Sequence, residues 1–203
     1  MLRGASTLLL DDADSLPSAS RQQMLAMIDR SATVMSDMID DLLTAADLEA
    51  GEVPLSVEPV DVRDLVEEAV DGARREDPAR SVVVRGLDDG LEVEADPDQA
   101  RRVLRALVVN AVRFSPQGGG VELVASAAGG EVSLLVLDRG SGVAAAERER
   151  VFEKFVRLDP RSGGAGLGLF LARGLARAMG GDVSLGPRED GGTAVCFTLR
   201  GRG

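Results

Sequence analysis

The sequence has no histidine, tyrosine or tryptophan, and it has one cysteine, Cys196, and one lysine, Lys154. Without histidine, no imidazole is available as a general base, a metal ligand or a phosphate acceptor. A single cysteine excludes an internal disulfide and, with no histidine beside it, argues against a zinc site. Cys196 lies in the apolar run TAVCFTL, so we expect a buried, unreactive thiol in a strand.

Long apolar runs and an excess of positive charge are also missing. No run of about 18 apolar residues exists, so we expect no membrane span. The short run Leu8–Leu10 is followed at once by acids, unlike the core of a signal peptide. The net charge of −11 argues against nucleic acid or an anionic membrane as the main partner. We therefore expect a cytoplasmic protein, or the cytoplasmic part of a longer one.

The first 50 residues have the pattern of an antiparallel helical hairpin. Residues 1–14 look helical, the segment 15–20 (SLPSAS) interrupts them, and a second helix is predicted from about residue 20 to residue 48. Apolar residues recur in the second helix every three or four positions: Met24, Leu25, Ile28, Met35, Met38, Ile39, Leu42 and Leu43. A hairpin cannot bury this stripe alone, so we expect a homodimer formed through residues 1–50. The alternative is that the stripe packs on the rest of the chain.

The remainder of the chain mixes short strands and helices without strict βαβ order, which favours an α+β layered sandwich. Helices are predicted to begin at Asp61 and at Asp96-Pro97, and a short one to span ERERVFEKF. The segments SVVVRGL and LEVEAD are predicted to pair across the turn DDG. Further hairpins are predicted around Gly129-Gly130 and between DVSL and TAVCFTL.

The segment GGAGLGL at residues 163–169 is rich in glycine, which allows a ligand to approach the backbone closely. It is no dinucleotide fingerprint, because Leu169 replaces the third glycine, and no P-loop, because no lysine follows. Taken alone, it indicates a flexible loop. Upstream, Asp138 ends an apolar strand, where it can accept a hydrogen bond from an exocyclic amine. Asn110 and Arg113 share a helix face and suit Mg²⁺ and phosphate, respectively.

Together, these segments resemble the ATP-binding domain of bacterial sensor histidine kinases, of the Bergerat-fold superfamily that includes gyrase. Four motifs match in order: LVVNAVRFSPQGG resembles the N box, LDRGSGV the first glycine box, VFEKFVR the F box and GGAGLGL the second glycine box. The resemblance covers roughly residues 53–200. It implies a two-layer Bergerat-type α/β sandwich over residues 53–203, preceded by a dimerisation hairpin over residues 1–52.

The resemblance also implies ATP and Mg²⁺ as ligands and a role for each matching residue. Asn110 would bind Mg²⁺, Arg113 would contact phosphate, and Asp138 would bind the adenine amine. The other implied nucleotide contacts are Gly140, Gly142, Arg157, Gly164, Gly166, Leu167 and Gly168. Arg161 is a further candidate on the nucleotide lid, which the resemblance places at about residues 156–165. Ala106 stands where the gyrase group has the glutamate that activates water, so we expect slow hydrolysis of ATP. The kinases usually have asparagine there, so Ala106 departs from them as well.

The family transfers the γ-phosphoryl group of ATP to a histidine in the hairpin, and this sequence has none. Three explanations stay open. The acceptor lies outside this sequence, or a separate protein carries it, or the chain is a degenerate, non-catalytic dimeric adaptor that binds nucleotide and signals by conformation. In the first two cases the protein is the kinase core of a two-component system, and a response regulator or a histidine-bearing protein is its expected partner.

Overall fold

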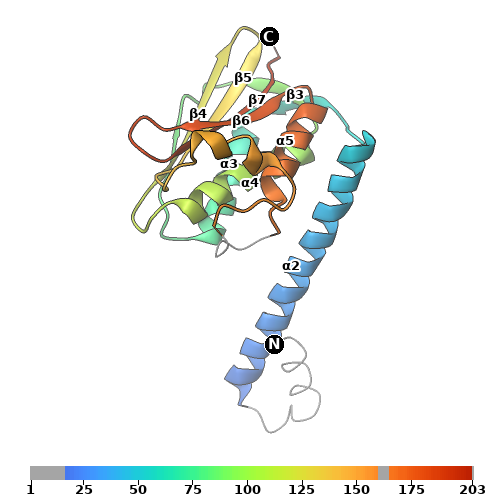
Figure 1. Ribbon diagram of the computed structural model, residues 1–203, viewed down its shortest axis with the longest axis vertical. Helices are drawn as coiled ribbons and strands as arrows, with labels where there is room; N and C mark the ends of the chain where they lie inside the picture. The colour runs from blue at the N-terminus through green and yellow to red at the C-terminus, as the bar shows by residue number, and fades with distance from the viewer. Residues whose placement is uncertain (1–16, 160–164, 203) are drawn as a thin grey trace. The chain divides into compact units, whose positions relative to one another are not determined.

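The computed structural model describes residues 17–159 and 165–202 and divides the chain into two compact units, Met1–Thr44 and Ala45–Gly203 (Figure 1). We describe each unit by itself. The helix expected over residues 1–14 lies outside the described residues. Among the described residues, no helix is both long enough and apolar enough to cross a membrane.

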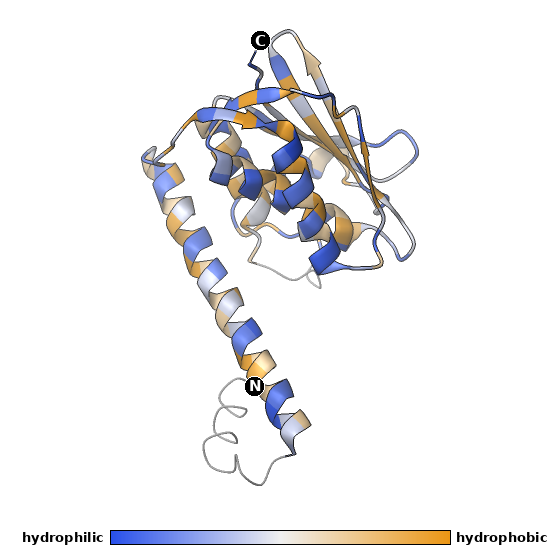
Figure 2. Cartoon of the chain, turned by 180° about the vertical axis from the view of Figure 1, so that it is seen from behind, coloured by the Kyte–Doolittle hydropathy of each residue, from blue (hydrophilic) through white to orange (hydrophobic). Residues whose placement is uncertain are grey.

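The second expected helix is confirmed as α2, which runs over Ser18–Ala50 and ends before Gly51, whose φ is +71°. Apolar residues recur along it, as the orange segments of α2 in Figure 2 show. Within the first unit, the large apolar side chains that are exposed form what we call the α2 stripe: Leu25, Val34, Met35, Met38, Ile39, Leu42 and Leu43. No other described residue of the first unit covers this stripe.

The last turn and a half of α2, residues 45–50, belongs to the second unit. Ala45 is buried in a small apolar cluster with Leu171. Leu48 fills the space beside Gly174, where an added Cβ would lie 2.6 Å from Leu48 Cδ1. The absence of a side chain at Gly174 therefore lets the end of α2 pack closely against α5 (Gly168–Ala178), the helix that contains Gly174.

The main sheet of the second unit has five strands in the order β2-β4-β5-β7-β6, with β2 parallel to β4 and the other pairs antiparallel. Their bounds are β2 Val82–Arg85, β4 Val121–Ala128, β5 Glu131–Leu137, β6 Asp182–Pro187 and β7 Thr193–Arg200. A second, two-stranded sheet pairs β1, Glu58–Asp61, with β3, Glu92–Ala95. The hairpins predicted around Gly129-Gly130 and at the C-terminal end are confirmed as β4–β5 and β6–β7.

The predicted pairing of β2 with β3 is wrong, because these strands belong to different sheets. Gly86 follows β2 with a φ of +67°, and an added Cβ there would lie 2.3 Å from the carbonyl oxygen of Ala125 on β4. This close backbone approach keeps β2 against β4 and turns the chain away afterwards. Periodicity identified both strands, but it carries no information on their partners.

Three helices, α3 (Val62–Glu76), α4 (Pro97–Phe114) and α5 (Gly168–Ala178), cover one face of the main sheet (Figure 1). Asp61 caps α3 by accepting from the Arg63 amide, and Asp96 caps α4 by accepting from the Gln99 amide, so both helices begin where predicted. The predicted short helix over ERERVFEKF is instead two 3₁₀ turns, η1 (Ala145–Glu147) and η2 (Arg150–Phe152).

The core lies between the helices and one face of the sheet. On β4, β5 and β7 buried and less buried residues alternate, so that one face of each strand points into the core. The largest fully buried side chains include Phe197, Leu65, Leu104, Leu107, Leu123 and Leu134. The architecture is therefore the two-layer α+β sandwich that the sequence predicted.

Candidate functional site

Asp138 follows β5 and is 5% exposed. Its Oδ1 accepts hydrogen bonds from the amides of Gly140, at 2.7 Å, and Thr193, at 3.0 Å. Two backbone donors therefore fix the carboxylate and occupy one oxygen. No donor among the described residues bonds to Oδ2, which remains available to accept a hydrogen bond from a ligand.

The segment after Asp138 lies directly against the end of α4. An added Cβ at Gly140 would lie 2.8 Å from the carbonyl oxygen of Phe114, so no side chain fits there. Beside it, the amide of Arg139 donates to Ser115 Oγ at 3.2 Å. The structure thus brings the last turn of the N-box helix and the first glycine box together.

The turn between β6 and β7 closes over the same segment. Gly142, whose φ is +74°, lies against Gly192, whose carbonyl oxygen is 3.2 Å from the position of an added Cβ. Gly192 itself has a φ of +108°, and an added Cβ there would lie 2.2 Å from the carbonyl oxygen of Asp138. The sequence analysis missed Gly192 and Thr193. The doublet Gly191-Gly192 before a strand was the available signal.

Asn110 and Arg113 both lie on α4, but in different surroundings. Asn110 is half-buried, and its side chain makes no hydrogen bond with any described residue. Arg113 is exposed, and its Nε donates to Oε1 of Glu76, the last residue of α3, at 2.7 Å. The guanidinium proposed for phosphate therefore already has a carboxylate partner.

The residues around Asn110 suit a magnesium ion held mainly by other ligands. In the part of the chain that the structure describes, no group of three or more acidic or cysteine side chains is placed to hold a metal. Ala106, one turn before Asn110, offers no side-chain oxygen. Mg²⁺ commonly keeps several waters and takes one or two protein oxygens together with nucleotide phosphates. One amide oxygen from Asn110 fits that donor set.

Among the described residues, no group caps the first backbone amides of α5. The N-cap residue Leu167 is 1% exposed and supplies no side-chain cap. Gly168 follows with no described heavy atom within 4 Å of an added Cβ. The first amides of a helix lack partners within the helix and favour an anion. Of the other predicted contacts here, Arg157 is exposed, whereas Gly164 and Arg161 lie outside the described residues.

The F box and the second glycine box interlock through their backbones. Phe155 has a φ of +64°, a conformation that non-glycine residues rarely adopt, and its amide donates to the Gly166 carbonyl at 2.9 Å. Gly166 has a φ of +72°, and an added Cβ would lie 2.8 Å from the carbonyl carbon of Phe155. Gly166 therefore accepts no side chain unless the backbone of Phe155 moves.

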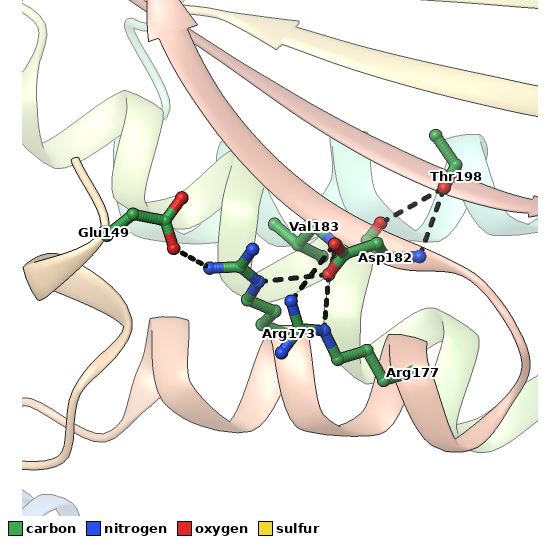
Figure 3. Close-up of polar contacts among 6 residues, drawn as sticks. All are labelled: Glu149, Arg173, Arg177, Asp182, Val183 and Thr198. Atoms are coloured by element: carbon green, nitrogen blue, oxygen red, sulfur yellow. Dashed lines mark hydrogen bonds and ion pairs between the residues drawn. The ribbon is translucent and has the colours of Figure 1, made fainter.

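A charged network joins α5 to the F-box segment and to β6 (Figure 3). Arg173 donates to Glu149 at 2.7 Å and to Asp182 at 3.1 Å, and its guanidinium lies 4.5 Å from the ring centre of Phe152. Burial alone would raise the pKa of Asp182, but hydrogen bonds from Arg177 and Arg173 outweigh it and lower the pKa. Burial likewise opposes the charge of Arg173, and its two acidic partners raise its pKa.

Similarity to known proteins identifies the family to which this site belongs. Residues 95–202 match the family model described as histidine kinase-, DNA gyrase B-, and HSP90-like ATPase. The chain is 36% identical to the sensor protein DivL of Caulobacter vibrioides, over 94% of this chain and 24% of DivL. It is 33% identical to the histidine protein kinase DivJ of the same organism, over 85% of this chain and 30% of DivJ.

Among solved structures, full-length ShkA in complex with AMPPNP is similar, with a TM-score of 0.76 and 32% identity. The match covers 98% of this chain and 42% of ShkA. The chain thus spans less than a third of the length of DivL or DivJ, and less than half of ShkA.

Proposed function

The chain belongs to the histidine kinase-, DNA gyrase B- and HSP90-like ATPase family and carries the ATP-binding kinase core of sensor histidine kinases, and from this premise we propose its ligands and reaction. It binds ATP with Mg²⁺ and transfers the γ-phosphoryl group to a histidine outside this sequence. The likeness to named histidine kinases supports this function over the non-catalytic adaptor.

The observation that carries this proposal is the state of the Asp138 carboxylate. Backbone amides occupy Oδ1, while Oδ2 has no donor among the described residues. A fixed acceptor at a strand end suits the exocyclic amine of adenine. Gly140 and Gly142 leave the adjoining backbone bare, which gives a planar base room to lie against it.

The phosphates would lie between α4 and the start of α5. The uncapped amides after Gly166, at Leu167 and Gly168, would donate to phosphate oxygens. Asn110 would hold Mg²⁺, which supplies charge neutralisation at the phosphates when bound. Arg113 and Arg157 are the cations proposed to contact phosphate. To do so, the Arg113 guanidinium would leave the carboxylate of Glu76 and pair with a phosphate oxygen instead.

The reaction needs little from the protein beyond positioning and charge. A nitrogen of the acceptor histidine forms a bond to the γ-phosphorus, the bond from that phosphorus to the β–γ bridging oxygen breaks, and ADP leaves. The imidazole releases one proton to solvent or to a base beside the histidine. Ala106 has no group that activates water, so transfer to histidine is favoured over hydrolysis. A response regulator would be the next acceptor of the phosphoryl group.

Binding of a fluorescent ATP analogue in the presence of Mg²⁺ tests the nucleotide site. We expect Asp138→Asn to raise the Kd for ATP about 30-fold, because the amide turns an N–H donor toward the adenine amine. Asp89→Asn, an exposed acid in the β2–β3 connection, serves as the control and should bind like the wild type. Wild-type affinity in Asp138→Asn, or no binding by the wild type at millimolar nucleotide, contradicts the proposal.

Transfer is tested with a separate hairpin that bears a histidine, incubated with the chain and radiolabelled ATP. Acid-labile label on the added hairpin supports the kinase, and loss of that label in Asn110→Ala supports the role of Asn110. A chain that binds ATP yet transfers no label to a histidine-bearing hairpin would favour the non-catalytic adaptor over the kinase.

We also propose that residues 1–52 form the dimerisation hairpin and residues 53–203 the ATP-binding domain. The exposed α2 stripe supports a second copy of this chain as the partner. Ile39→Glu should shift the protein toward monomer in sedimentation experiments, because it places a charge in the stripe. Thr33→Glu adds the same charge at a polar position, and the dimer should keep its mass in the same sedimentation experiment.

A further inference from the structure

Arg188 lies in the turn between β6 and β7, yet its side chain is only 8% exposed. The guanidinium folds back over the sheet instead of reaching into water. Its Nη1 donates to the carbonyl oxygen of Asp138 at 3.3 Å, and its Nη2 forms an ion pair with Glu122 on β4. One side chain thus connects the turn, the proposed adenine-binding residue and β4, which lies two places from β7 in the sheet.

Glu122 is a strong partner for this arginine. Its side chain is 23% exposed, and Arg85 and Arg139 also lie within ion-pair distance, at 3.7 and 3.8 Å. The hydrogen bond from Arg188 is the main cause that lowers the pKa of Glu122, against burial and with help from the charges of Arg188, Arg85 and Arg139. Glu122 is therefore ionised at neutral pH and holds Arg188 in place.

Asp138 depends on the same turn for its orientation. Its amide donates to the carbonyl of Thr193, and the amide of Thr193 donates to its Oδ1, each at 3.0 Å. Gly192 allows the close approach of the two backbones. If the turn moves, the carboxylate loses one of the two donors that fix it. The pair Arg188–Glu122 anchors this turn through side chains, independently of the β5–β7 backbone pairing.

We propose that the Arg188–Glu122 pair positions Asp138 for base selection, so that Oδ2, which has no donor among the described residues, meets the amine of adenine and excludes guanine. This inference rests on the proposed function. Guanine carries a carbonyl oxygen where adenine has its amine, and a fixed carboxylate repels that oxygen. A site that hydrogen-bonds a particular group discriminates strongly only while its own polar groups stay in place. Arg188 is thus a positioning residue for specificity.

The ratio of the Kd for GTP to the Kd for ATP tests this role, measured by competition with a fluorescent nucleotide on the full chain with Mg²⁺. Arg188→Met should raise the Kd for ATP about tenfold and change the Kd for GTP little, so the ratio falls about tenfold. Arg188→Lys should recover part of the ratio, because lysine still pairs with Glu122. Arg85→Met is the matched control: it removes another arginine from Glu122 but no contact with Asp138, and should keep the ratio.

A second variant covers the case in which Arg188→Met does not fold. Glu122→Gln keeps the size of the side chain and removes the charge, and we expect the ratio to fall about threefold. An unchanged ratio in both Arg188→Met and Glu122→Gln, or an equal fall in Arg85→Met, overturns the positioning role. A wild-type chain that binds no ATP overturns the proposed function instead, and the inference with it.

Discussion

The base end and the phosphate end of the proposed site are stabilised in different ways. At the base end, two backbone amides hold the Asp138 carboxylate, and the turn between β6 and β7 closes over it. At the phosphate end, α5 begins without a side-chain cap, and the Cβ position of Gly168 faces open space. On the proposed function, the base is recognised by a prearranged acceptor, whereas the phosphates bind amide donors that have no partner among the described residues.

Adding one methyl group at the base end should have the largest effect. In Gly140→Ala the new Cβ would lie 2.8 Å from the Phe114 carbonyl oxygen and 3.0 Å from Asp138 Oδ1, so backbone must move. We expect the free energy of unfolding to fall by about 2 kcal/mol and ATP affinity to fall with it. Urea unfolding and nucleotide titration measure both. Wild-type values in both would show that this end is not tightly packed.

The same methyl group at the phosphate end should separate binding from folding. Gly168→Ala meets no described atom within 4 Å and begins a helix, so stability should stay equal or rise slightly. We expect about a tenfold loss of ATP affinity, because the methyl lies where phosphate would approach, and no loss for adenosine. Calorimetric titration of both ligands measures the difference. Equal losses for ATP and adenosine would contradict this picture of an open phosphate end.

Releasing Arg113 should improve phosphate binding slightly. Glu76→Gln removes the carboxylate that pairs with Arg113, and we expect ATP affinity to rise about threefold with little change in stability. Glu68→Gln is a matched control, since Glu68 pairs with Arg101 between the same two helices at 3.2 Å. Reduced ATP affinity in Glu76→Gln alone would mean that the ion pair holds Arg113 in its binding position.

Acid should act on the network behind α5 and have the smallest effect. The pKa of Asp182 is below its usual value, so the folded state gains stability above the unfolded pKa, near 3.8, and loses it as pH falls through the folded pKa. Arg173 and Arg177 on α5 face this carboxylate, and Glu149 faces Arg173. Asp182→Asn should flatten the fall in melting temperature below pH 4. An unchanged acid profile would show that Asp182 contributes nothing there.

The difference between the two ends of the site is accompanied by a difference in which features could be predicted from the sequence. Asp138 and Gly140 lie within one short motif, and residues of helices and strands follow local periodicity. The partners of Asp138 lie far along the chain, with Thr193 55 residues and Arg188 50 residues away. Such contacts depend on how the strands pair, which composition and periodicity do not contain. The pairing of β2 with β4 was missed for the same reason.

Glu76 shows the same limit at the phosphate end. Arg113 was predicted from the sequence as a phosphate contact. Its pairing with Glu76, 37 residues away, was not predicted, because no local pattern connects the two residues. The two helices bring them together only after α3 and α4 pack. By contrast, the starts of α3 at Asp61 and of α4 at Asp96-Pro97 were correctly predicted, because a cap bonds to amides two or three residues further on.

The packing of Leu48 beside Gly174 decides at which residue a shortened protein should begin if the ATP-binding unit is to be produced alone. A shortened protein starting at residue 53 would lack Ala45 and Leu48 and would expose the apolar surface around Leu171 to water. Exposed apolar surface of this kind promotes aggregation. The practical boundary for expression therefore falls inside a helix, several residues before the loop at which a sequence-based division of the chain would place it.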